Sequence, residues 1–316
     1  MLRLNNIVLL VVVMGGLLLA LSLCGQGDPV FRADANSVVL HTTVVDRSGK
    51  LVTDLPQKAF KVYENNVEQQ IKLFRREDIP VSLGLVIDNS GSMKAKRQKV
   101  EAATIQLVKA SNPQDQAFIV NFNDESYLDC AFTSSIPKLE ESLTRIDSRG
   151  GTAMRDAISM SIDYMKENAK LDKKIIFVVT DGDDNMSNIT LEQLVQKAQQ
   201  SEVLIYAIGL LDEEDRRAAR RAERAINTIT EASGGAAYYP KELAEVGEIA
   251  LRVAHEVRNQ FTLAYTPADL ALDGSYRQIR VTVQGPNRPT ARTRTGYYAS
   301  AEPRSKQVAS KPTSTN

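Results

Sequence analysis

Predominantly apolar runs alternate with amphipathic segments through the middle of the chain, from residue 81 to about residue 259. Short runs that are mostly apolar on both faces are typical of strands buried on both sides. They occupy 81–87, 117–122, 175–180 and 203–208, with a shorter one at 236–239. Apolar residues recur at helical spacing between them, in segments 100–108, 154–165 and 243–253. This order predicts an α/β fold, with a doubly wound, mainly parallel sheet and helices on both faces.

The segments that flank this region alternate between apolar and polar residues, as half-buried strands do. In 28–80, a strand-like run at 38–45 precedes a turn, and further alternating positions follow at 60–62 and 67–74. The same pattern returns at 260–265, 278–283 and 292–298. The ends of compact domains usually lie close together, so an insertion between them is tolerated. We therefore predict that 260–300 packs with 28–80 in a small β-sandwich-like unit, with 81–259 as the insertion.

Both ends of the chain differ from its body. An uncharged run at 7–23 follows Arg3, so residues 1–27 are predicted to be a signal peptide. An uncleaved N-terminal membrane anchor is the alternative, because a membrane span needs about 20 apolar residues. Cys24 offers a third outcome, since its surroundings resemble a bacterial lipoprotein box, although Leu23 stands where that box has a small residue. Each outcome places the body outside the cytosol, in the periplasm, on the cell surface or secreted. Residues 301–316, rich in Ser, Thr, Lys and Pro, are predicted to be disordered.

Charge and cysteine content narrow the function classes. Basic and acidic residues balance at 39 each, which gives no reason to expect a nucleic-acid partner, and any membrane contact is expected only through the N-terminal segment. Cys130 is the single cysteine of the body, so no internal disulfide is expected, and a semi-buried apolar role is predicted. Segment 212–232 carries dense opposite charges at helical spacing, which indicates a solvated, salt-bridged helix.

Side chains with oxygen donors follow two of the predicted strands and one loop. The run DNSGS places Asp88, Ser90 and Ser92 after the first strand, Asp181 follows another strand in VVTDGDDN, and Thr152 lies in GGTAMRDA. Ligands of open α/β sheets bind at the carboxyl ends of strands, so the three loops are expected to meet there. Hard cations prefer oxygen ligands, which predicts that these five residues bind Mg²⁺, or Mn²⁺ or Ca²⁺. Few carboxylates in the inner shell would leave the ion able to recruit a carboxylate from a partner.

Simpler roles exist for several of these polar residues. Ser92 is also suited to cap a helix that begins near residue 93. Residues 183–185 are interpreted as a loop before a helix that Thr190 and Gln193 begin as a capping box, with a second cation there as the weaker interpretation. Two further acidic residues near the site lack a motif and are left unassigned: Asp124 and Asp156.

The run DNSGS after a strand, Thr152 in GGTAMRDA and Asp181 in TDG resemble the metal-ion-dependent adhesion site of von Willebrand factor type A domains. All five positions of that site are present in order. The chain is similar to the bacterial exported subgroup, whose flanking β segments resemble FKVYENN and RTGYYA. The resemblance covers 81–259 strongly and the flanks more weakly. It implies a bound Mg²⁺ or similar ion, recognition of protein ligands, and a last helix able to shift between two positions.

The predicted function is an exported, divalent-metal-dependent protein-binding module, for adhesion or complex assembly, that captures an acidic ligand group through the cation. The alternative is an envelope scaffold whose metal is purely structural. A metal-dependent hydrolase is disfavoured, because Ser90 stands where an aspartyl phosphatase has its second Asp, and no motif places His41 or His255 near Ser90. We therefore expect no enzymatic activity. The sequence leaves the oligomeric state open.

Overall fold

A six-stranded sheet forms the centre of the α/β region. The computed structural model describes residues 37–300 except 77, 111, 145–147 and 212–214. The strand order is β10-β9-β8-β5-β6-β7. The strands are β5 (Val81–Asp88), β6 (Gln116–Phe122), β7 (Ser126–Thr133), β8 (Lys173–Thr180), β9 (Val203–Gly209) and β10 (Ala237–Tyr238). All neighbouring pairs are parallel except β6 with β7, which confirms the predicted mainly parallel sheet.

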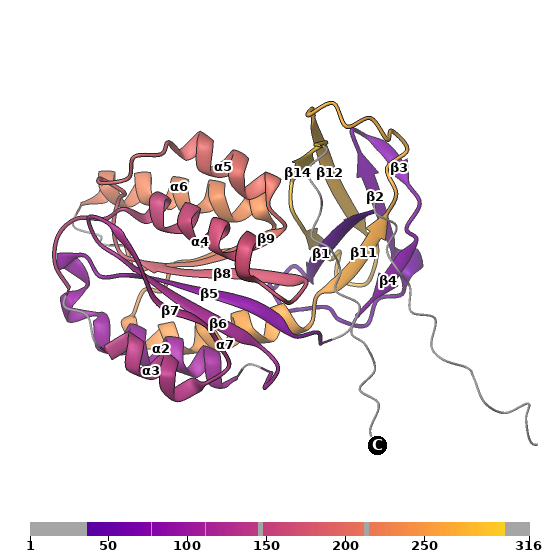
Figure 1. Cartoon of the computed structure of the whole chain (residues 1–316). Helices are drawn as coiled ribbons and strands as arrows, with labels where there is room; N and C mark the ends of the chain where they lie inside the picture. The colour runs from indigo at the N-terminus through magenta and orange to yellow at the C-terminus, as the bar shows by residue number, and fades with distance from the viewer. Residues whose placement is uncertain (1–36, 77, 111, 145–147, 212–214, 301–316) are drawn as a thin grey trace, which may run out of the picture. The chain divides into compact units, whose positions relative to one another are not determined.

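Helices cover both faces of this sheet (Figure 1). One face carries α4 (Met154–Asn168), α5 (Leu191–Gln200) and α6 (Arg216–Ser233), and the other carries α2 (Arg97–Lys109), α3 (Ile136–Thr144) and α7 (Val246–Arg258). Each face has its own apolar core, and β5 contributes to both, with Leu85 on one side and Val86 on the other. Short 3₁₀ helices occur at η1 (Gln57–Ala59), η2 (Gly91–Ala95) and η3 (Leu243–Glu245). The doubly wound fold class is confirmed.

The flanking segments form two four-stranded sheets, each built from both ends of the chain. Their orders are β13-β1-β11-β4 and β14-β12-β2-β3. The N-terminal strands are β1 (Val38–Val45), β2 (Phe60–Glu64), β3 (Val67–Gln69) and β4 (Leu73–Arg75), and the C-terminal strands are β11 (Phe261–Tyr265), β12 (Tyr276–Val283), β13 (Thr290–Arg292) and β14 (Gly296–Tyr298). One apolar core, which includes Leu40, Phe60, Phe261 and Ile279, joins them. Aromatic rings of Phe60, Phe74 and Phe261 pack together in it, with centroids 4.9–5.6 Å apart.

A buried carboxylate links α7 to strands of both regions. Glu256 is almost completely buried and accepts hydrogen bonds from the hydroxyls of Thr43, Tyr206 and Tyr238, at 3.1, 2.7 and 3.1 Å, and from the Arg292 guanidinium. These donors belong to β1, β9, β10 and β13. One residue later, the Val257 carbonyl accepts a hydrogen bond from Lys173 Nζ at 2.5 Å. The C-terminal turn of α7 is therefore held on several sides.

Several elements differ from the sequence-based expectation. Strand β7 and helix α3 were not expected, and β8 begins two residues earlier than the apolar run, at the buried Lys173 and Lys174. Helix α6 begins after Asp215, whose carboxylate caps it, and ends at Ser233, followed by the C-cap Gly234 with a φ of 90°. No helix within the described part of the chain is long and apolar enough to cross a membrane. The predicted leader, including 7–23 and Cys24, and the predicted tail lie outside the described residues.

Candidate functional site

Asp88 stands at the carboxyl end of β5, fixed by two donors. It is 1% exposed, because β5 is buried along its whole length. Its Oδ1 accepts the backbone N–H of Ser90 at 2.8 Å, and its Oδ2 accepts the hydroxyl of Thr180 at 2.6 Å. Thr180 is the last residue of β8, the neighbouring strand, so parallel pairing places it beside Asp88. Both carboxylate oxygens are thus oriented before any ligand arrives.

The serines connect Asp88 to the second acidic loop. Ser90 Oγ and Ser92 Oγ are 3.1 Å apart, and Ser92 Oγ donates to Asp181 Oδ1 at 2.7 Å. The alternative role of Ser92 as a helix cap is not observed, since Ser92 lies inside η2 and its hydroxyl is bound to Asp181. Ser90 is buried while Ser92 is exposed, so the cluster opens to solvent on the Ser92 side.

Thr152 reaches the same edge from the loop before α4. A Cβ placed on Gly182 would lie 3.6 Å from Thr152 Oγ1, so this hydroxyl lies against the turn that follows Asp181. The loop is held by the N–H of Thr152 donating to Asn185 Oδ1 at 2.9 Å, and by the N–H of Gly91 donating to the Gly150 carbonyl at 3.1 Å. The structure thus brings all five sequence-predicted residues to one place from three loops.

The electrostatics of the cluster favour a cation. Burial raises the pKa of Asp88 to about 6, the hydrogen bonds from Thr180 and Ser90 oppose that rise, and the charge of Asp181 adds to it. Lys96 Nζ donates to Asp181 Oδ2 at 2.6 Å and to the Leu210 carbonyl at 3.4 Å. The side chain of Asp181 is 0% exposed and that of Lys96 is 27% exposed. A positive charge from the chain itself therefore already lies on this carboxylate.

The donor set fits a hard divalent ion. Two carboxylates and three hydroxyls are oxygen ligands of the kind that Mg²⁺, Mn²⁺ and Ca²⁺ take. Within the described ranges no group of three or more His, Cys, Asp or Glu side chains is arranged to hold a metal. Binding here would consequently depend on the hydroxyls of Ser90, Ser92 and Thr152, which leave more of the ionic charge uncompensated than carboxylates would.

Acidic residues around the cluster have structural partners. Asp124 accepts the N–H of Gly151 at 2.7 Å, and Asp156 accepts those of Asn188 and Ile189 at 2.9 and 3.1 Å. Asp124 and Asp156 were left unassigned from the sequence, and the structure shows that their carboxylates hold the loops through backbone N–H groups. The sequence also missed Lys96, because nothing in its spacing indicates that it turns back to Asp181.

The loop at 183–185 is braced in the same manner. Asp184 accepts the N–H of Arg155 at 2.7 Å and the hydroxyl of Ser187 at 2.8 Å, which leaves little capacity for a second cation. The helix that follows begins with the predicted capping box, in which Thr190 and Gln193 exchange hydrogen bonds of 2.9 and 3.2 Å.

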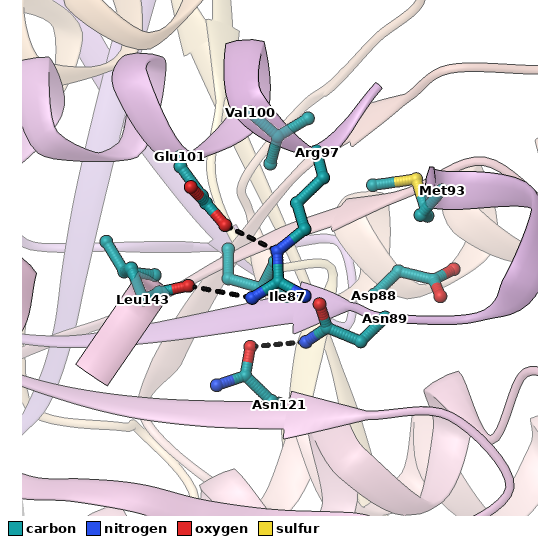
Figure 2. A pocket seen from close by; sticks show the side chains of 9 residues that line it. All are labelled: Ile87, Asp88, Asn89, Met93, Arg97, Val100, Glu101, Asn121 and Leu143. Atoms are coloured by element: carbon teal, nitrogen blue, oxygen red, sulfur yellow. Dashed lines mark hydrogen bonds and ion pairs between the residues drawn. The ribbon is translucent and has the colours of Figure 1, made fainter. Parts of the chain in front are cut away.

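A small pocket lies behind Asp88 (Figure 2). Its volume of about 10 Å³ is room for one water molecule. Arg97 spans it, with Nε 2.5 Å from Glu101 Oε1 and Nη2 3.1 Å from the Leu143 carbonyl. Asn89 and Asn121 close it with a 2.6 Å hydrogen bond, and Figure 2 shows the carboxylate of Asp88 pointing away from this pair. The pocket does not suit an organic substrate.

The histidines and the cysteine lie elsewhere. His41 is on β1, where its Nδ1 is 3.4 Å from Thr262 Oγ1, and burial together with nearby positive charges lowers its pKa well below the usual value. His255 is exposed on α7. Cys130 is buried in β7. Among the described contacts none joins these residues to the oxygen cluster.

Residues 83–183 match the family model of the von Willebrand factor type A domain. A curated relative, inter-alpha-trypsin inhibitor heavy chain H4 from Bos taurus, is 26% identical over 147 residues, which are 42% of this chain and 16% of that protein. This chain therefore matches only about a sixth of the length of that relative. Among solved structures, proximal thread matrix protein 1 from the mussel byssus, with a zinc-occupied MIDAS motif, is similar with a TM-score of 0.50 at 15% identity, over 61% of this chain and 49% of that one. The von Willebrand factor domain of a type V pilus tip protein from Porphyromonas gingivalis has a TM-score of 0.46 at 13% identity, over 57% and 97%.

Proposed function

We propose that this chain, whose residues 83–183 match the von Willebrand factor type A model, is an exported, divalent-metal-dependent protein-binding module. In this proposal the cation, for which Mg²⁺ is the first candidate, is held by five residues: Asp88, Ser90, Ser92, Thr152 and Asp181. The observation that carries the proposal is the convergence of these oxygen donors from three loops, with Ser92 hydrogen-bonded to Asp181 at 2.7 Å. When bound, the ion supplies a positive charge that accepts a carboxylate oxygen of a protein partner as its last ligand.

The protein's own groups determine how tightly and where that carboxylate binds. Thr180 and the Ser90 N–H hold Asp88 in a fixed orientation, so little reorganisation is needed on binding. The exposed Ser92 hydroxyl lies on the open side of the cluster, where a partner can approach.

Binding without turnover is part of this proposal. A serine hydrolase needs a general base within hydrogen-bond reach of its nucleophile, and the described partners of Ser90 are Asp88 and Ser92. Export is supported by the uncharged run at 7–23, which suits a signal sequence or an anchor. The body would then act in the periplasm, on the cell surface or in the medium.

The test is metal titration followed by ligand capture. Isothermal titration of the metal-free protein with MgCl₂, MnCl₂ and CaCl₂ should give one site, lost in Asp181→Asn and in Asp88→Asn. Asp163→Asn is the matched control, because Asp163 is exposed on α4 and pairs with Lys197, away from the cluster. Heat released at the same single site in all three variants would contradict the proposed ligands.

Capture separates the binding module from the scaffold alternative. Immobilised protein is incubated with envelope extract in Mg²⁺ or in chelator, and retained proteins are identified by mass spectrometry. A partner retained only in Mg²⁺ by the wild type and not by Asp88→Asn supports capture through the ion. A partner that is retained equally well in chelator and in Mg²⁺ would instead indicate a purely structural role for the metal.

A further inference from the structure

Five arginines gather on one side of α6: Arg216, Arg217, Arg220, Arg221 and Arg224. All five are exposed. At 100° per residue they fall within a sector of roughly 140°, opposite the side on which Ala222 and Ile226 are buried. Over the rise of about 1.5 Å per residue they extend for roughly 12 Å along the helix. We call these five residues the arginine face.

The arginine face is continuous with the oxygen cluster. Arg221 Nε donates to Asp183 Oδ2 at 2.6 Å, and Asp183 is two residues beyond Asp181. The strand before α6, β9, ends one residue before Leu210, whose carbonyl accepts from the Lys96 side chain that also binds Asp181. The N-terminal half of α6 and the cluster therefore share the carboxyl edge of the sheet.

The expectation of a salt-bridged helix is met only at one arginine. Within the described residues, Arg221 has an ion pair with Asp183, and the other four members of the arginine face have no acidic partner within 4.0 Å. Segment 212–224 holds five arginines and five acidic residues, one of which is the exposed Glu223, so the arginine face is distinguished by the position of its charges on the helix and not by a net charge of the segment. The sequence places three acidic residues, at 212–214, before the helix cap Asp215 and outside the described part.

We propose that the arginine face binds an acidic segment of a protein partner, one carboxylate of which is taken by the cation. This inference rests on the proposed function and names the class of its ligand. Guanidinium groups can bind carboxylates with paired, planar hydrogen bonds. Arg221 already donates one hydrogen bond to a carboxylate oxygen of Asp183. Four residues of extended chain, at about 3.3 Å each, span the length of the arginine face, so alternate acidic side chains can reach it.

An apolar contact favours a peptide over another polyanion. Met186 is 45% exposed in the segment that follows Asp181, and its N–H donates to the Thr152 carbonyl at 3.2 Å, so it lies beside the loop that carries Thr152. A large exposed methionine beside a polar site suits the apolar side chains of a polypeptide. A sulfated polysaccharide would offer charge to the arginine face and no such contact.

The probe is fluorescein-labelled poly-L-glutamate of about 20 residues, titrated with the full mature chain in 0.15 M NaCl with Mg²⁺. The test variant carries Arg216→Ser, Arg217→Ser, Arg220→Ser and Arg224→Ser, and Arg221 is kept because it braces Asp183. The control removes four exposed positive charges elsewhere, by Lys58→Ser, Lys138→Ser, Lys170→Ser and Arg252→Ser. All replaced side chains are exposed, and thermal melts verify that both variants fold.

We expect the test variant to lose at least tenfold in affinity for poly-L-glutamate, and the control less than threefold, with Mg²⁺ titrations unchanged in both. Equal losses of affinity in the two variants, or no loss in either, would overturn the proposal that the arginine face binds the acidic segment. Dextran sulfate bound by the wild type as tightly as poly-L-glutamate would also overturn it, in favour of unspecific polyanion binding. If the test variant alone loses affinity for poly-L-glutamate and a chelator does not change the affinity of the wild type, the role of the arginine face is supported. The same result would contradict only the proposed role of the metal site.

Discussion

The replacement of Lys96 by Met is expected to strengthen divalent-cation binding. Lys96 Nζ lies 2.6 Å from Asp181 Oδ2, on a carboxylate whose side chain is fully buried. A divalent ion bound by Asp181 would have to displace this ammonium group or share the carboxylate with it. Methionine keeps the length and apolar stem of lysine without the charge, so it removes the competitor with little change in packing.

The magnitude follows from that one contact. A hydrogen bond to a charged group contributes about 1.5–3 kcal/mol, and 1.4 kcal/mol is a factor of ten in an equilibrium constant. Lys96 is 27% exposed, so solvent screens part of its charge and the lower end of the range applies better. We therefore expect Lys96→Met to raise the affinity for Mg²⁺ and Mn²⁺ roughly tenfold or more, within an upper bound of about a hundredfold.

Isothermal titration of metal-free wild type and variant with MnCl₂ measures the change directly. Lys94→Met is the matched control, because Lys94 is exposed on the same 3₁₀ helix and has no described acidic partner. A loss of one positive charge at a distance should change the control affinity less than threefold in 0.15 M salt, since exposed charges are screened. Equal effects of the two substitutions, or weaker binding in Lys96→Met, would refute the reasoning.

Three further perturbations test other parts of the structure. Glu256→Ala should lower the free energy of unfolding in urea by about 3–5 kcal/mol, because a buried charge pair loses one partner; the exposed Glu248→Ala should change it by less than about 0.5 kcal/mol. The pKa of Asp88 is raised to about 6, so Mg²⁺ affinity should fall about tenfold per pH unit below pH 6 as protons compete, and an affinity independent of pH from 4.5 to 7.5 would exclude ionised Asp88 as a ligand. Burial lowers the pKa of Lys173 from 10.5 to about 7. The unfolded chain then binds more protons between these values, so the stability rises with pH from 7 to 10.5, and urea titrations should show a smaller rise in Lys173→Met.

The strands of the central sheet could be predicted from the sequence where both faces are buried, because such strands contain few polar residues. The runs that became β5, β6 and β9 matched to within one residue, because a parallel strand covered by helices on both faces is mostly apolar. Strand β7 was missed for the opposite reason. It is an antiparallel edge strand whose residues are exposed or half-buried apart from the buried Cys130, so neither an apolar run nor a clean alternation marks it.

The start of β8 shows a different limit. Lys173 and Lys174 are buried there, although lysine is rarely found inside a protein. What holds Lys173 is the carbonyl of Val257, 84 residues later in the chain, and no local pattern reveals a contact of that range. A sequence-based boundary therefore stops at Ile175, where the apolar residues begin.

The candidate site followed from a rule of topology more than from its individual residues. Carboxyl ends of parallel strands share one edge of a sheet, so residues after β5 and β8 had to be neighbours there. Their role as metal ligands remains a prediction. The residues that hydrogen-bond to the cluster could not be predicted from the sequence. Thr180, Asn185 and Lys96 reach it only because the folded loops orient their side chains toward it.

The mixed origin of the two four-stranded sheets has a consequence for synthesis. The carbonyl of His41 on β1 accepts a hydrogen bond from Thr293, 252 residues later, and β1 pairs with both β11 and β13. A nascent chain therefore carries unpaired N-terminal strand edges until its last strands are made, and such edges invite aggregation. Prior folding of the intervening α/β region brings the two flanks together and shortens the effective loop that they must close. We therefore expect the inserted region to fold before the β unit is completed, because the last strands of the β unit are synthesised after it.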